Sequence, residues 1–154
     1  MTETLELPAE YREDDMIFFE DGLIGFENFK RYVMIESEAF SPFYLLQCVD
    51  KKEVSVLVLD PGLVVKNYNQ SVPDADWSSI GVAEDSPKLS FVVSILRSTE
   101  ENCSANFRAP ILINFNEMTG RQVTLNKTRF SVTQPLVSHM QKSTERTMVA
   151  GQSN

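Results

Sequence analysis

The chain has 154 residues with ten Phe and one Trp, enough apolar material for a single folded domain. Its formal net charge is −8. All of this net charge lies in residues 1–27, which contain nine acidic residues and one basic residue, Arg12. The remaining residues hold thirteen charges of each sign. Phosphate affinity comes from clustered Lys and Arg, so the charge distribution argues against direct nucleic-acid binding.

The sequence shows no targeting or membrane-spanning pattern. Residues 1–6 lack the basic and then apolar regions of a signal peptide. No apolar run approaches the roughly 18 residues that a membrane-spanning helix needs. These features predict a cytoplasmic protein that does not enter a membrane.

The acidic end of the chain allows two interpretations. Four of its carboxylates flank the first predicted strand: Asp14, Asp15, Glu20 and Asp21. Such a surface attracts and steers a partner with a basic surface. It equally suits a solvated edge that keeps the protein soluble, and the sequence leaves both interpretations open.

The first predicted strand, residues 16–19, leads into a loop over residues 20–27. Gly22 and Gly25 mark two bends in this loop. A phosphate-binding loop is not expected, because the glycine pattern is absent and the flanking carboxylates repel phosphate. The apolar residues of the loop are Leu23, Ile24 and Phe26. They either close the core or form an exposed contact patch.

Most later elements are predicted as β-strands, because short apolar runs alternate with turn residues. Their ranges are 29–35, 42–49, 54–59, 88–96, 111–115, 121–125 and 129–133. Residues 63–68 are compatible with another strand, and residues 74–80 with one short helix. We expect Gly120 to end the turn over residues 116–120 with a positive φ.

Strand spacing of roughly ten residues is typical of antiparallel β-structure, either a barrel or two packed sheets. We therefore predict a mainly β, antiparallel β-barrel-like single domain over residues 16–136, with at most one or two short helices. We expect residues 1–15 to form a frayed acidic segment. Residues 137–154 form a polar tail, either disordered or a short terminal helix. We expect a monomer.

The sequence offers little for catalysis. The single histidine, His139, lies in the polar tail, so nucleophile–base pairs and His-rich metal sites are not expected. The GxSxG and HExxH motifs are absent. Asp14 and Asp21 are a formal pair for acid–base chemistry, but acids near a terminus are usually solvated. We expect a protein without enzymatic activity, cofactor or metal.

Three segments of the sequence contain motifs whose order and spacing are informative when they are taken together. They are residues 19–27; residues 42–50, with 58–61 after them; and residues 106–114, closed by 120–123 and 135–136. Together these segments resemble the FliW family of flagellar assembly factors. The resemblance implies a β-barrel-like domain that binds cytoplasmic flagellin before export. It also implies a second partner, the RNA-binding translational regulator CsrA, which the flagellin-free protein holds away from flagellin mRNA.

This resemblance suggests two binding surfaces. An apolar groove for an amphipathic flagellin helix is expected from Leu23, Ile24 and Phe26, with Phe43 and Ile111 nearby. The carboxylates of Asp14, Asp15, Glu20 and Asp21 are expected to steer association with CsrA. Two other functions remain open: a small-ligand-binding β-barrel without catalytic activity, and a carbohydrate-active enzyme with two carboxylates in a cleft.

Overall fold

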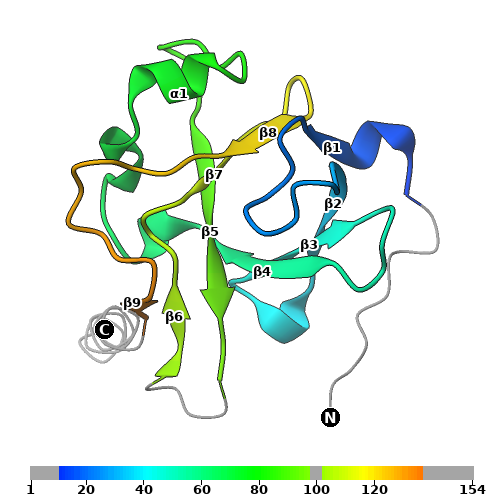
Figure 1. Cartoon of the computed structure of the whole chain (residues 1–154), viewed down its shortest axis with the longest axis horizontal. Helices are drawn as coiled ribbons and strands as arrows, with labels where there is room; N and C mark the ends of the chain where they lie inside the picture. Colours follow the sequence, from blue (N-terminus) through cyan, green and yellow to red (C-terminus); the bar gives the residue numbers. More distant parts are fainter. Residues whose placement is uncertain (1–10, 98–101, 137–154) are drawn as a thin grey trace, which may run out of the picture.

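The computed structural model describes residues 11–97 and 102–136. Within this part of the chain, nine strands form one sheet, and seven of them close into a barrel (Figure 1). In order around the barrel the seven are β1 (Met16–Phe19), β2 (Arg31–Glu36), β3 (Tyr44–Cys48), β4 (Ser55–Leu59), β5 (Leu89–Ile95), β7 (Ile111–Asn114) and β8 (Thr119–Gln122). The prediction of a mainly β, barrel-like domain is confirmed.

Two short strands and several single turns complete the described chain. The strands β6 (Ser104–Ala105) and β9 (Gln134–Pro135) extend the sheet from β5. The α-helix α1 (Asp74–Ser78) lies within the range predicted for a helix, and its first turn is acidic. The 3₁₀ turns are η1 (Glu13–Asp15), η2 (Glu38–Phe40), η3 (Pro61–Leu63) and η4 (Tyr68–Ser71).

The barrel closes through a short parallel pairing of β1 with β8, whereas its other strand pairs are antiparallel. At this seam Phe19 pairs with Gly120. A Cβ on Gly120 would lie 2.4 Å from Cε2 of the Phe19 ring. The expected positive φ at Gly120 is wrong, because Met118 takes that conformation at φ 54°. Gly120 is instead needed for the close approach of the aromatic ring.

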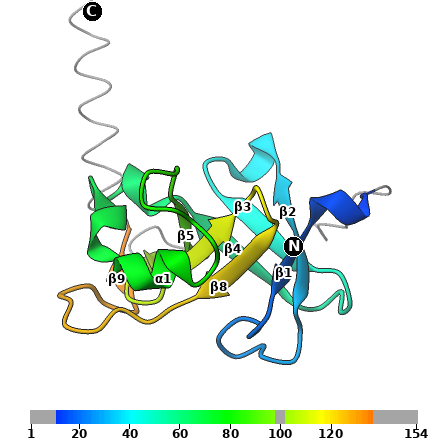
Figure 2. The same ribbon diagram turned by 90° about the horizontal axis from the view of Figure 1, so that it is seen from above.

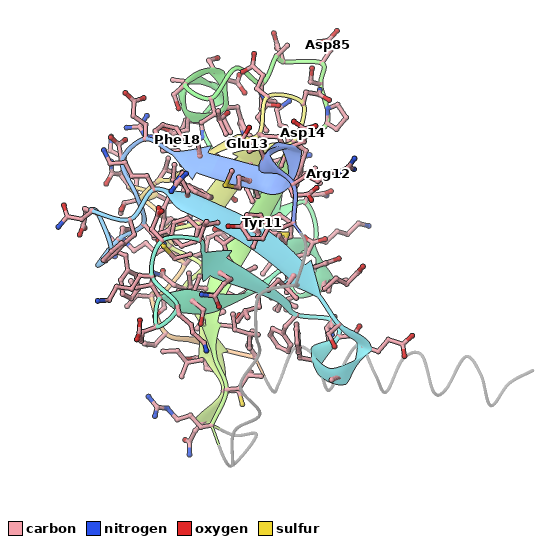
Figure 3. All side chains as sticks on the ribbon, turned by 90° about the vertical axis from the view of Figure 1, so that its right-hand side faces the viewer. Tyr11, Arg12, Glu13, Asp14, Phe18 and Asp85 are labelled. Carbon is pink, nitrogen blue, oxygen red and sulfur yellow. The ribbon has the colours of Figure 1, made fainter. Side chains whose placement is uncertain are left out.

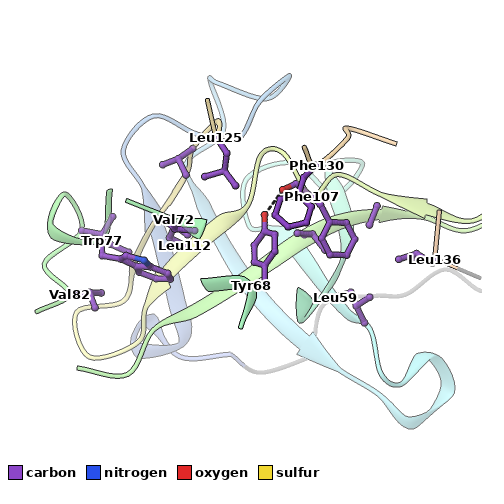
Figure 4. Close-up of a cluster of buried hydrophobic side chains, with 14 of the residues drawn as sticks. Leu59, Tyr68, Val72, Trp77, Val82, Phe107, Leu112, Leu125, Phe130 and Leu136 are labelled. Atoms are coloured by element: carbon purple, nitrogen blue, oxygen red, sulfur yellow. Dashed lines mark hydrogen bonds between the residues drawn. The ribbon is translucent and has the colours of Figure 1, made fainter. Parts of the chain in front are cut away.

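Two apolar cores lie on opposite faces of the sheet. Ile111 and Ile113 point into the barrel, whereas Leu112 packs outside it. The outer core lies beneath α1 and η4, with Trp77 and Tyr68 among its largest side chains (Figure 4). Figure 2 shows α1 on the side of the molecule away from β1 and β2. Both faces of β7 are buried, one in each core, and this explains why the strand carries apolar residues on both faces.

One predicted strand is wrong, and one segment that was compatible with a strand forms none. The run 63–68 forms no strand, because η3 begins after Asp60 and Asn67 takes a left-handed conformation at φ 60°. The run 129–133 also forms no strand, and only β9 follows it. There the Ser131 hydroxyl accepts a bond from the Thr133 N–H at 3.0 Å. Local side-chain to backbone bonds of this kind compete with strand pairing.

Several expectations fall on residues that the structure does not describe. The tail at 137–154, which contains His139, and most of the acidic segment at 1–15 lie outside the described ranges. In the described residues, no helix combines the length and the apolar character needed to cross a membrane.

We expect Gly120→Ala to lower the free energy of unfolding by about 2 kcal/mol, because the new methyl group would clash with the Phe19 ring. Urea unfolding followed by circular dichroism measures this loss. The double variant Gly120→Ala with Phe19→Leu should lose less than the sum of the two single changes, since the smaller side chain makes room. Additive losses would show that Gly120 acts without contacting Phe19.

Two buried tyrosines should respond oppositely to loss of the hydroxyl. The Tyr68 hydroxyl donates to the Phe107 carbonyl, so Tyr68→Phe should cost about 1 kcal/mol. The Tyr32 hydroxyl is buried without a hydrogen-bond partner among the described residues. Tyr32→Phe should therefore leave the free energy of unfolding at pH 7 unchanged or raise it by about 1 kcal/mol. Denaturant unfolding of both variants checks this contrast.

The same tyrosines predict a loss of stability in alkali. Burial raises the pKa of Tyr32 to about 12 and also raises the pKa of Tyr68. Above pH 10 the unfolded chain releases these protons while the folded protein retains them, so the free energy of unfolding falls as pH rises from 10 toward 12. Tyr32→Phe should make this decline shallower. An identical decline in the variant would contradict the assignment.

Candidate partner-binding surfaces

The loop 20–27 has a shape fixed by its own backbone. Gly22 takes φ +65°, and a Cβ there would lie 2.6 Å from the Phe26 carbonyl oxygen. The Phe26 N–H donates to the Leu23 carbonyl at 2.7 Å. The Glu27 carboxylate accepts a bond from the Gly25 N–H at 3.0 Å, and this bond is the main cause that lowers the pKa of Glu27. The backbone conformation at Gly22 and the hydrogen bond at Gly25 therefore fix the path of the loop.

Gln122 ties this loop to the rest of the barrel. Its side-chain oxygen accepts a bond from the Ile24 N–H at 2.9 Å. Its side-chain nitrogen donates to the Ala109 carbonyl, also at 2.9 Å. One amide therefore joins the loop to the stretch before β7, although Ile24 and Gln122 are 98 residues apart in the sequence. Gln122 lies within the sequence motif 120–123, but the sequence predicts no role for its side chain.

An apolar groove of about 210 Å³ lies beside the loop. We define the apolar groove by six of its lining residues: Leu23, Ile24, Phe26, Val56, Ile95 and Val132. Three of their side chains face solvent, with exposed fractions of 54% for Ile24, 46% for Ile95 and 55% for Val132. Leu23 is buried and Phe26 is half-buried against the barrel core. The loop therefore both closes the core and presents apolar surface.

Two residues expected near the groove lie elsewhere. Ile111 is fully buried inside the barrel, and Phe43 belongs to the outer core. Neither lines the apolar groove, because each is directed into a packed interior. The residues that complete the groove, Val56, Ile95 and Val132, come from distant parts of the chain. Ile95 lies in the predicted strand 88–96, but the sequence does not indicate which segment lies against that strand.

The four acidic residues divide into two pairs. Asp14 and Asp15 are exposed in η1, at the start of β1 (Figure 3). Glu20 and Asp21 are exposed beyond the end of β1, where they line a second cavity.

This second cavity, of about 260 Å³, is here called the acidic cleft and defined by six of its lining residues. These are Phe18, Glu20, Asp21, Glu117, Thr119 and Arg121. Asp21 and Arg121 form an exposed ion pair at 3.5 Å. Glu117, which sequence reasoning did not single out, reaches the cleft from the turn between β7 and β8.

The carboxylates at these surfaces are exposed side chains. In the described ranges, no group of three His, Cys, Asp or Glu residues is placed to hold a metal ion. Asp14 does not line the acidic cleft with Asp21. The acids that do line it are all exposed, whereas a carboxyl that acts as a general acid at neutral pH is usually buried.

Comparison with known proteins identifies the family. The model of the FliW protein family matches residues 2–136. A flagellar assembly factor FliW of Clostridium botulinum (strain Alaska E43) is 31% identical over 128 residues, which cover 83% of this chain and 91% of that protein. The FliW of Thermoanaerobacter pseudethanolicus is 27% identical over 135 residues, covering 87% of this chain and 90% of that protein.

A solved structure agrees with the sequence matches. A crystal structure of the flagellar assembly factor FliW superimposes with a TM-score of 0.72 at 25% identity, covering 82% of this chain and 89% of that chain. The shared fold includes the closed barrel that positions the apolar groove and the acidic cleft. Since the family model extends over nearly the whole described domain, the chain belongs to the FliW family of flagellar assembly factors.

Proposed function

We propose that this protein binds cytoplasmic flagellin as a chaperone-like partner and, when free of flagellin, binds the translational regulator CsrA. Accumulating flagellin then releases CsrA, so that the flagellin level feeds back on flagellin translation. The observation that carries the proposal is the apolar groove, in which three exposed apolar side chains stand beside a loop of fixed shape.

The groove suits one face of an amphipathic helix. Helix-in-groove recognition needs a few apolar anchors surrounded by a polar rim. Ile24, Ile95 and Val132 supply the anchors, and the polar residues Asn106 and Gln122 lie at the same groove. Because Gln122 already fixes the Ile24 backbone, little ordering is required of the loop on binding. Flagellin, whose terminal segments are amphipathic, is the partner that the resemblance to FliW implies.

The acidic residues suit a basic second partner. Asp14, Asp15, Glu20 and Asp21 are all exposed, and of these Asp21 pairs with Arg121. Exposed charges of one sign accelerate encounter with a surface of the opposite sign. An RNA-binding regulator such as CsrA carries such a surface.

The two other functions have weaker support. A small-ligand pocket usually encloses about 300–1,000 Å³, and the groove and the cleft are smaller and open to solvent. A carbohydrate-active enzyme would need two carboxylates directed at one bond, with the acid held protonated by burial. The exposed carboxylates here favour a binding protein.

Ile24→Asp should abolish co-purification of flagellin, because it places a charge at an exposed apolar anchor. The expected loss is about 2 kcal/mol of binding or more, roughly a thirtyfold rise in Kd. The free energy of unfolding should change by no more than about 0.5 kcal/mol, since Ile24 is largely solvent-exposed. Pull-down and calorimetric titration with purified flagellin provide the measurement.

Leu63→Asp is the matched control, because Leu63 is 49% exposed but lies in η3, outside the groove. It should bind flagellin like the unaltered protein. If both variants bind flagellin normally, the groove is not the binding site. If Ile24→Asp unfolds, Ile24 is needed for the core instead.

Affinity for CsrA should fall as salt rises. The screening length shortens from about 30 Å at 0.01 M salt to about 8 Å at 0.15 M, so attraction between exposed charges weakens. Titration at several salt concentrations should show Kd rising, chiefly through slower association. A Kd that stays constant across this range would rule out electrostatic steering by the acidic residues.

A further inference from the structure

The tip of the loop, residues 23–26, has one hydrogen bond to a distant part of the described chain. It is the bond that the Ile24 N–H donates to the Gln122 side-chain oxygen at 2.9 Å. The other bonds of the tip within the described ranges stay inside residues 20–29. Those local bonds fix the shape of the tip but not its place on the barrel. Buried Leu23 holds one side of the tip by packing, and Gln122 holds the side that carries Ile24.

Gln122 is itself held by a rigid part of the barrel. Its backbone lies in β8, which pairs with the fully buried strand β7. Its side-chain nitrogen donates to the Ala109 carbonyl at 2.9 Å. The Ala109 N–H donates to the Asn106 side-chain oxygen at 3.0 Å, and the Asn106 N–H donates to the Val93 carbonyl at 2.8 Å. A chain of hydrogen bonds therefore runs from β5 to Ile24.

The two partners of Gln122 require a side chain that both donates and accepts. The Ile24 N–H can only donate and the Ala109 carbonyl can only accept, so one orientation of the amide satisfies both. A Glu carboxylate would accept from Ile24 but would turn a second acceptor toward the Ala109 oxygen, and a Met side chain would bond to neither. The geometry therefore calls for an amide of this length at position 122.

We propose that Gln122 is a positioning residue for partner binding, which holds Ile24 at the apolar groove where an amphipathic helix meets it. Ile24 lines the groove together with Ile95 and Val132. Without the Gln122 bond the tip leaves this position part of the time, and a partner binds only the fraction of molecules that have Ile24 in place. This inference rests on the proposed binding of flagellin and adds the residue that prepares the site.

Gln122→Met tests the role, because it keeps the length of the side chain and removes both hydrogen bonds. In the full chain without a partner, the Ile24 amide proton should exchange with solvent about fivefold faster, as measured by NMR. The association rate of purified flagellin should fall about fivefold, since fewer molecules hold Ile24 in place. The dissociation rate should change less than about twofold, because the apolar anchors of the bound helix are unchanged. Ile24→Ala should do the opposite and act mainly on dissociation.

Asn114→Leu is the matched control. The Asn114 side chain also joins two backbone segments, since it accepts from the Glu117 N–H at 3.1 Å and donates to the Ile80 carbonyl at 2.8 Å. It does not line the apolar groove. Asn114→Leu should lower the free energy of unfolding at least as much as Gln122→Met. It should leave Ile24 exchange and flagellin association unchanged.

Gln122→Asn, whose shorter amide cannot reach both partners, is a second variant with the same expected rates. The positioning role is overturned, while flagellin binding stands, if Gln122→Met leaves Ile24 exchange unchanged or slows flagellin association no more than Asn114→Leu does. It is also overturned if neither Gln122 variant folds, because Gln122 is then needed for the barrel itself. If the unaltered protein does not bind flagellin, the proposed function fails and the positioning role fails with it.

Discussion

The contact between the Phe19 ring and the bare backbone of Gly120 underlies the rest of the structure. It lies where β1 and β8 pair in parallel, and this pairing closes the barrel. Phe19 also packs edge-on against Tyr32, with ring centroids 5.4 Å apart, so the seam is joined to the inner core. The Phe19 carbonyl accepts the Gly22 N–H at 2.9 Å, which starts the loop 20–27 at a defined point. Closure of the barrel and the position of the loop thus depend on one residue.

Both candidate surfaces meet at that loop. Asp21 contacts Arg121 at the acidic cleft, and Ile24 contacts Gln122 at the apolar groove. Arg121 and Gln122 are neighbours on β8, so consecutive residues of one strand support surfaces of opposite character. The Arg121 contact is an exposed ion pair that salt screens. The Gln122 contact is a neutral hydrogen bond, which salt affects little. Ionic strength should therefore act on the cleft far more than on the groove.

The sequence predicts the elements that arise from a local pattern of residues. It does not predict contacts between residues that lie far apart in the chain. The apolar run at residues 88–96 is visible in the chain, and β5 (Leu89–Ile95) lies within it. Residues 129–133 also alternate polar and apolar side chains, but local bonds, such as the one that the Thr133 N–H donates to the Ser131 hydroxyl, replace strand pairing. The apolar loop residue Ile24 was identified as a candidate anchor. Its neighbours Ile95 and Val132 were not, because only the closed barrel brings them together.

The parallel seam has a consequence for how the protein is made. Phe19 leaves the ribosome about a hundred residues before Gly120, its partner in the sheet. At about 5–20 residues per second, that interval lasts roughly 5 to 20 s. The antiparallel β1–β4 strands can pair during this time, but the inner face of the sheet remains open on one side. The nascent chain thus passes through a period in which apolar residues of its inner core are exposed.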